Sequence, residues 1–118
     1  MPRIYIYKNC DTCRKALKFL KSHSVPFQEI PIRETPPSKA ELEQMLRSCN
    51  GELRRLFNTS GGDYKSLNMK EKLPRLSEKE ALELLSKNGN LVKRPFLIGP
   101  GVSLAGFDGA AWTKALGL

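Results

Sequence analysis

The first 32 residues contain two short apolar segments with an amphipathic segment between them, and this order constrains the fold most. Residues 3–7 (RIYIY) are β-branched and aromatic, as in a short buried strand. From Asp11 to Ser22 the apolar positions repeat as on one face of a helix: Cys13, Ala16, Leu17 and Leu20. Residues 25–32 (VPFQEIPI) predict a second strand. A strand, a helix and a strand within about 30 residues make a βαβ unit, so the two strands should be parallel.

The rest of the chain predicts a helical block followed by a β-β-α unit. Capping boxes at residues 38–41 (SKAE) and 77–80 (SEKE) each predict the start of a helix. The segments PFLIG and VSLAGF surround the turn dipeptide Pro100-Gly101 and predict an antiparallel hairpin, and Asp108 is the expected N-cap of a last helix. We therefore predict one α/β domain over residues 1–118. It should have a thioredoxin-like fold with a mixed four-stranded sheet and a helical subdomain inserted at about residues 36–92.

Cys10 and Cys13 form a CxxC pair where the first predicted strand gives way to the first predicted helix. Backbone N–H groups at a helix start are unpaired, and the helix dipole favours negative charge there, so a thiolate at Cys10 should be stabilised. Lys8 and Arg14 should strengthen this effect, while Asp11 opposes it. The helical periodicity puts Cys13 on the apolar face and leaves Cys10 exposed. An exposed attacking thiol with a sheltered resolving thiol suits thiol–disulfide exchange.

Two alternatives to a redox pair are open. Both cysteines could be inert core residues, although Cys10 lies between polar residues. They could also bind zinc, but a structural zinc normally needs a second pair of ligands, and only Cys49 and His23 remain. Cys49 shares a predicted helical face with apolar residues and is expected in the core, and His23 is expected to cap a helix end. We therefore expect a redox pair and no metal site.

The net charge of +8 does not by itself indicate a nucleic-acid partner. The 20 lysines and arginines are spread along the chain, whereas nucleic-acid binding usually concentrates them on one face. An anionic substrate or an acidic protein partner would also fit this charge. No apolar segment approaches the roughly 20 residues of a membrane span, and the first residues do not resemble a signal peptide. We expect a cytoplasmic monomer that binds neither nucleic acid nor membranes.

Three segments resemble the ArsC/Spx family, which contains glutaredoxin-linked arsenate reductases, the regulator Spx and YffB-type proteins. They are YKNCDTCRKALKFLKSHSVPF, LRRLFNTSGGDYKSLN and NGNLVKRPFLIGPGVSLAGF. The resemblance implies a thioredoxin-like fold with a helical insert, a nucleophile at Cys10, a site arginine at Arg94 and a proline, Pro95, that is usually cis. Together with the CxxC pair it gives a predicted site in which Cys10 and Cys13 are catalytic and Arg14, Arg94 and Pro95 bind substrate.

The resemblance implies two possible functions. The first is a thiol–disulfide oxidoreductase of the ArsC/YffB type, with no bound cofactor and with glutathione, glutaredoxin or thioredoxin as the reductant. Arsenate itself is not the expected substrate, because the stretch containing Asn58 and Ser60, and Gly106 further on, lack two of the three arginines that surround the nucleophile in arsenate reductases. The second is a Spx-like regulator that uses the cysteine pair as a sensor and binds the RNA polymerase α subunit. The resemblance sets Gly51 beside a glycine that Spx uses at that interface, but the late motifs are nearer to the YffB type, which favours the enzyme.

Overall fold

A mixed four-stranded sheet forms the centre of the computed structural model, which describes residues 1–118. The strand order is β2-β1-β3-β4. β1 (Arg3–Ile6) pairs in parallel with β2 (Gln28–Pro31) and antiparallel with β3 (Phe96–Gly99). β4 (Val102–Ala105) completes the antiparallel hairpin with β3. The predicted α/β class, the parallel βαβ unit and the hairpin are confirmed.

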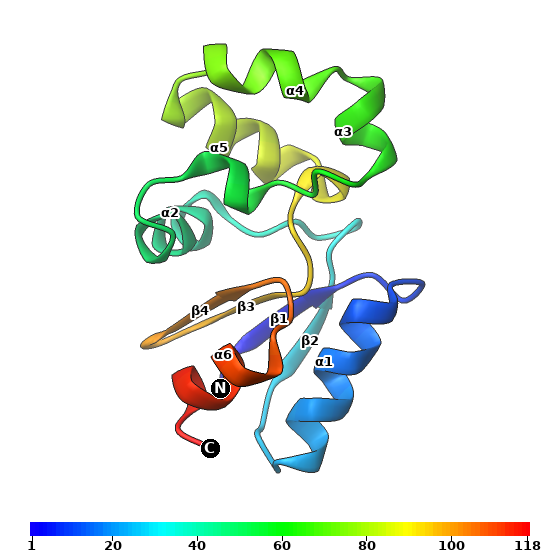
Figure 1. Ribbon diagram of the computed structural model, residues 1–118, viewed down its shortest axis with the longest axis vertical. Helices are drawn as coiled ribbons and strands as arrows, with labels where there is room; N and C mark the ends of the chain where they lie inside the picture. Colours follow the sequence, from blue (N-terminus) through cyan, green and yellow to red (C-terminus); the bar gives the residue numbers. More distant parts are fainter.

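Two helices cover one face of this sheet, as Figure 1 shows below the strands. They are α1 (Asp11–Ser22), which connects β1 to β2, and α6 (Gly109–Leu116) at the end of the chain. The predicted N-cap of α6 is confirmed, because the Asp108 carboxylate accepts hydrogen bonds from the backbone N–H groups of Ala110 (3.0 Å) and Ala111 (3.4 Å). None of the helices in the structure has the length and apolar character that a membrane crossing requires.

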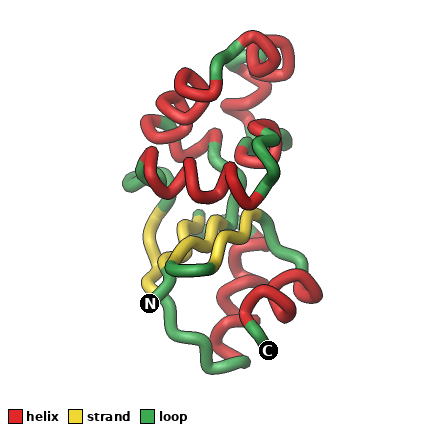
Figure 2. The backbone as a smooth tube through the Cα atoms, turned by 90° about the vertical axis from the view of Figure 1, so that its left-hand side faces the viewer, coloured by secondary structure: helices red, strands yellow, loops and turns green.

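The opposite face carries the helices between β2 and β3, so the sheet lies between two helical layers (Figure 2). In chain order they are α2 (Lys39–Ser48), η1 (Leu53–Leu56), α3 (Gly62–Ser66), α4 (Met69–Lys72), η2 (Leu73–Arg75), α5 (Glu78–Lys87) and η3 (Gly89–Leu91). Both predicted capping boxes are present, at the starts of α2 and α5. Two backbone hydrogen bonds join the early and late parts of this block, from Asn58 to Leu91 (2.7 Å) and from Lys93 to Leu56 (2.8 Å).

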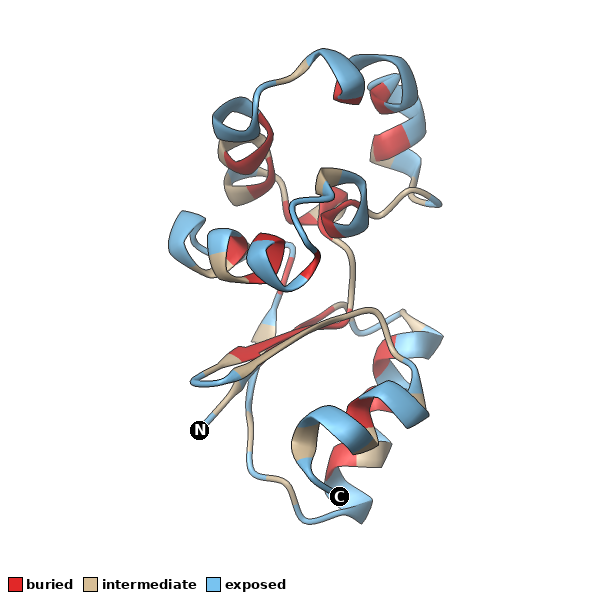
Figure 3. Cartoon of the chain, turned by 60° about the vertical axis from the view of Figure 1, so that its left-hand side comes forward, coloured by how far each residue is buried: buried red, intermediate tan, exposed pale blue.

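Successive side chains along β1 and β3 point to opposite faces of the sheet and belong to two separate hydrophobic cores. On the α1 side, the strand residues Ile4, Ile6 and Leu97 pack with the helical residues. On the other side, Tyr5, Phe96 and Ile98 pack with the α2–α5 block. Figure 3 shows the buried residues on the strands and on the inward sides of the helices. The start of α1 is thus fixed by packing against the same strand that leads into the CxxC pair.

Candidate functional site

Cys10 is the N-cap of α1, in the turn that follows β1. Its Sγ accepts a hydrogen bond from the backbone N–H of Cys13 at 3.3 Å. Its own N–H donates to the carbonyl of Tyr7 (3.1 Å), and its carbonyl accepts the N–H of Arg14 (3.1 Å). The side chain is partly exposed. A thiolate here would therefore be reachable from solvent while it is bonded to an otherwise unpaired helix-start amide.

Cys13 is fully buried one helical turn further on, in the core beneath α1. Burial raises the pKa of its thiol to about 12, and the hydrogen bond and charge of Cys10 act in the same direction. A backbone hydrogen bond with Tyr7 and the positive charge of Arg94 act against this rise. Both cysteines are free thiols in the structure. The pair is therefore asymmetric in access, and burial makes the Cys13 thiol a weaker acid than an ordinary cysteine.

Arg94 approaches the cysteine pair from the segment before β3. Its guanidinium carbon lies 5.1 Å from the centroid of the Tyr7 ring, and its Nη1 is buried without a hydrogen-bond partner. Leaving a buried donor unpaired is costly, and this sets Arg94 apart from Arg14 and Arg33, which have protein partners. The following residue, Pro95, is buried, and the Arg94–Pro95 peptide bond is cis, as the family resemblance implied.

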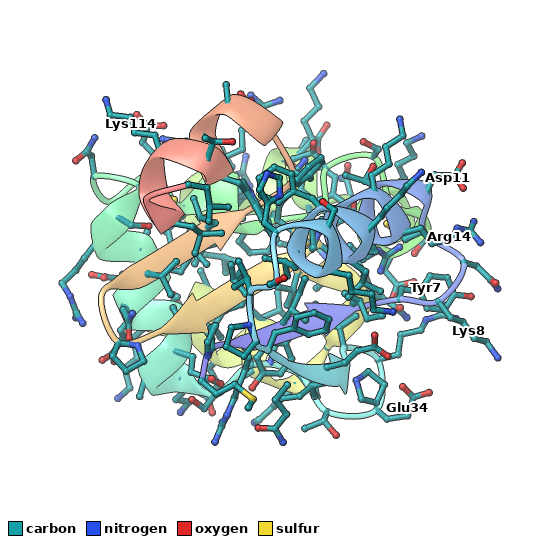
Figure 4. The ribbon with its side chains drawn as sticks, turned by 90° about the horizontal axis from the view of Figure 1, so that it is seen from below. Tyr7, Lys8, Asp11, Arg14, Glu34 and Lys114 are labelled. Atoms are coloured by element: carbon teal, nitrogen blue, oxygen red, sulfur yellow. The ribbon has the colours of Figure 1, made fainter.

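Arg14 stands at the same end of the molecule, close to the start of α1, where Figure 4 shows it beside Asp11. Its guanidinium donates to the Asp11 carboxylate at 2.6 Å, and both side chains are exposed. An anion would have to compete with Asp11 for this arginine. The structure therefore puts Arg14 near the nucleophile but pairs its charge within the helix.

Arg33, which sequence reasoning missed, belongs to the same site. It follows β2, donates to Tyr7 Oη at 3.0 Å and to Asn90 Oδ1, and its guanidinium carbon lies 4.4 Å from the Tyr7 ring centroid. Arginine over an aromatic face at this distance is a cation–π contact. No local motif marks Arg33. The available signal was the parallel pairing of the two strands, whose carboxyl ends meet at one edge. We call Tyr7, Arg33 and Arg94 the arginine–tyrosine cluster.

The residues considered for a zinc site do not join the CxxC pair. Cys49 is buried in the core on the other side of the sheet, as predicted. His23 is the C-cap of α1, also as predicted, and its ring Nδ1 lies 2.9 Å from the carbonyl oxygen of Phe19. No three His, Cys, Asp or Glu side chains come together in a way that could hold a metal ion.

Comparison with known proteins places these residues in a family context. The model of the ArsC family matches residues 5–115. The uncharacterized protein YusI of Bacillus subtilis is 50% identical over 91 residues, 77% of each chain. The global transcriptional regulator Spx of Listeria innocua is 31% identical over 98 residues, which cover 83% of this chain and 73% of Spx. A crystal structure from Bacteroides fragilis, described as ArsC family related, has a TM-score of 0.88 at 34% identity and covers 97% of both chains.

Proposed function

The chain belongs to the ArsC family, and from this premise we propose that it is a thiol–disulfide oxidoreductase in which Cys10 attacks and Cys13 resolves. The observation that carries the proposal is the asymmetry of the pair. Cys10 is partly exposed and its sulfur accepts a helix-start N–H, whereas Cys13 is buried with a pKa raised to about 12. Only Cys10 is therefore both reachable from solvent and hydrogen-bonded to a helix-start amide.

The proposed reaction consists of two exchanges. The Cys10 thiolate attacks one sulfur of a disulfide R–S–S–R, the S–S bond breaks, a Cys10–S–S–R bond forms, and the leaving thiolate takes a proton from solvent. Cys13 then attacks Cys10 Sγ, and its proton passes to the second departing thiolate. The products are two R–SH and a Cys10–Cys13 disulfide, so two electrons have moved from the pair to the substrate. Because burial raises the pKa of Cys13, its thiol must lose its proton during this second step.

The oxidised pair must then be reduced by an external thiol, and we propose glutathione, glutaredoxin or thioredoxin for this role. No bound cofactor enters the scheme. The cytoplasm is the proposed compartment, because these reductants keep thiols reduced there. Arg94 and Pro95 precede β3, Arg94 contacts the Tyr7 ring, and Arg14 is an exposed cation in the first turns of α1, so all three remain proposed substrate-binding residues.

Arsenate is not the substrate that we propose. By the family resemblance, the stretch with Asn58 and Ser60, and Gly106, lack two of the three arginines of arsenate reductases. A thiolate attacking an oxyanion needs that charge neutralised first, and each charged hydrogen bond contributes about 1.5–3 kcal/mol. Two such losses lower transition-state stabilisation about a hundredfold or more. Little turnover of arsenate is expected with glutathione and glutaredoxin.

The test is reduction of 2-hydroxyethyl disulfide by glutathione, followed with the wild type, Cys10→Ser and Cys13→Ser. Cys10→Ser should abolish the protein-dependent rate, and Cys13→Ser should accumulate a mixed disulfide on Cys10 that mass spectrometry detects. Diamide should convert the wild type to a Cys10–Cys13 disulfide, found by peptide mapping. Turnover that survives Cys10→Ser, or a diamide product that contains Cys49, would refute the assignment.

A second candidate is a Spx-like regulator, favoured by the 31% identity to Spx of Listeria innocua and by the CxxC pair. In this role the pair would be a redox sensor, and the protein would bind the RNA polymerase α subunit. Gly51 is exposed at the turn after α2, and a Cβ built there meets nothing within 4 Å, but its φ of +81° strains any other residue, so Gly51→Arg tests a protein interface only together with a urea titration that shows the variant folded. Capture of the α subunit by the wild type, weakened by Gly51→Arg, would support the regulator. Turnover without such capture supports the enzyme.

A further inference from the structure

The arginine–tyrosine cluster presents two guanidinium groups beside the CxxC pair, and neither is in an ion pair. We propose that Arg33 and Arg94 bind a carboxylate group of the substrate, so that the protein selects carboxylate-bearing thiols and disulfides. This inference rests on the proposed function, because it names the substrate class of the same site.

Both arginines retain donors for a ligand. Arg33 uses Nε for Asn90 and Nη1 for Tyr7 Oη, which leaves its Nη2 without a protein partner. Arg94 has a buried Nη1 with no partner. Glu34, which follows Arg33 in the sequence, is exposed and forms no ion pair with it. Two neighbouring cations with free donors and no counterion favour an anion between or beside them.

The cluster is close enough to the reacting sulfurs to hold one end of a small substrate. Tyr7 begins the turn that ends at Cys10, and its carbonyl accepts the Cys10 N–H at 3.1 Å. The charge of Arg94 acts on the Cys13 thiol, which requires proximity. A substrate whose sulfur meets Cys10 can therefore reach the two guanidinium groups with a side group a few bonds away.

A carboxylate is the group that fits these donors best. The planar guanidinium fork matches a carboxylate with two parallel hydrogen bonds, and the Tyr7 ring holds the fork of Arg33 in place. Small organic thiols derived from amino acids or peptides carry this anion within a few bonds of sulfur. Inorganic phosphate shares the oxyanion chemistry, so it is the competitor against which the assignment must be tested.

Arg33 also makes a structural contact, which predicts a different result. Its bond to Asn90 ties the α2–α5 block to the end of β1 through Tyr7. If Arg33 only held this contact, its loss would slow the reaction of Cys10 with all disulfides equally. If it binds carboxylate, the loss will be confined to anionic substrates. Asn90→Ala removes the structural bond and leaves both charges, so it separates the two roles.

The experiment measures how fast Cys10 of the reduced protein forms a mixed disulfide with three reagents of equal size class. They are 3,3′-dithiodipropionate (anionic), 2-hydroxyethyl disulfide (neutral) and cystamine (cationic). The wild type should favour the anionic over the neutral reagent, and Arg33→Gln should reduce that ratio about tenfold, the loss of one charged contact. Asn90→Ala and the matched charge control Arg75→Gln, an exposed arginine of η2, should leave the ratio unchanged.

The outcomes distinguish this inference from the function on which it rests. If Cys10 reacts with none of the three reagents, the proposed function fails. If the neutral reagent reacts but the wild type and Arg33→Gln have the same ratio of anionic to neutral rates, only the carboxylate site is refuted. An equal change in Asn90→Ala refutes it in favour of a structural role. Should Arg33→Gln fail to fold, the wild type is tested by competition instead. Propionate should slow the reaction of Cys10 with the anionic reagent and not with the neutral one. Slowing by inorganic phosphate alone would overturn the carboxylate assignment.

Discussion

Replacing Gly89 by alanine should be strongly destabilising, because this glycine lies directly against the backbone at the end of β2. A Cβ at Gly89 would lie 2.7 Å from the carbonyl carbon of Ile32, closer still to its oxygen, and 3.2 Å from Arg33 Cα. All three atoms belong to the backbone, so no flexible side chain can turn away. Gly89 does not have a left-handed φ, and the substitution therefore tests close packing rather than backbone strain.

The size of the effect follows from that overlap. Extra methylene groups in packed sites cost about 1–3 kcal/mol, and more where the backbone must shift. Here the distance from the new Cβ to the Ile32 carbonyl group would have to open to at least 3.0 Å, and both segments are buried backbone. The usual gain from a less flexible unfolded chain, about 0.4–1 kcal/mol, offsets only part of this. We expect a loss of about 3 kcal/mol, a large share of the 5–15 kcal/mol typical of a domain.

Urea unfolding followed by circular dichroism measures this loss, with Gly62→Ala as the matched control. Gly62 is the exposed first residue of α3, and a Cβ there meets nothing within 4 Å, so alanine should be neutral or stabilising by up to about 1 kcal/mol. If Gly89→Ala unfolds at the wild-type urea concentration with the same slope, the close approach does not constrain the fold. Because Gly89→Ala displaces Arg33, it should also lower the preference for the anionic disulfide.

Three further outcomes are expected. Limited iodoacetamide should label Cys10 first, because burial raises the pKa of the Cys13 thiol to about 12, and earlier labelling of Cys13 in the mass spectrum would contradict the assignment. Burial and the hydrogen bond to Glu41 (2.6 Å) raise the pKa of Tyr5 to about 12, above its unfolded value of about 10. The resulting stability is present below pH 10 and lost as the pH rises toward 12, so Tyr5→Phe should unfold in urea with a flatter dependence over that range. Ser77→Ala should remove the α5 cap and cost about 0.5–2 kcal/mol by urea titration.

The elements that were predicted well are those with a local signal. The capping boxes place their hydrogen bonds within four residues, so α2 and α5 begin where the sequence indicated. Pro100-Gly101 and Asp108 act in the same local way at the hairpin and at α6. In each case the residues that determine the conformation are neighbours in the chain, and no distant contact is needed to recognise them.

The short helices in the middle of the block were not resolved by the sequence. Only the two capping boxes marked helix starts in this block, but α3 begins at Gly62, and neither α3 nor α4 has a side-chain cap. Helices of four or five residues have little stability of their own and form where tertiary packing supports them. Tyr64 and Met69 supply that packing from inside the core, and the sequence gives no sign of it.

Among the residues of the candidate site, some are likewise marked by sequence neighbours and one depends on a distant contact. The cysteine pair was proposed from a short motif, and Arg94 and Pro95 were proposed from the family resemblance. The pairing of Arg14 with Asp11 is a three-residue neighbour effect that helix geometry allows one to anticipate. Arg33 is different, because its partner Tyr7 is 26 residues away in the chain. Only the register of two strands brings them together.

That register explains why this position matters. In the parallel pair, Ile6 lies opposite Pro31, and the N–H of Ile32 donates to the Ile6 carbonyl at 2.9 Å. Continuing that offset by one residue puts Ile32 opposite Tyr7, and Arg33 is the next residue, at the edge where the CxxC turn begins. From there the Arg33 guanidinium carbon lies 4.4 Å from the centroid of the Tyr7 ring. With Arg94, Arg33 gives the proposed site two guanidinium groups against one tyrosine ring, and their planar forks suit a carboxylate.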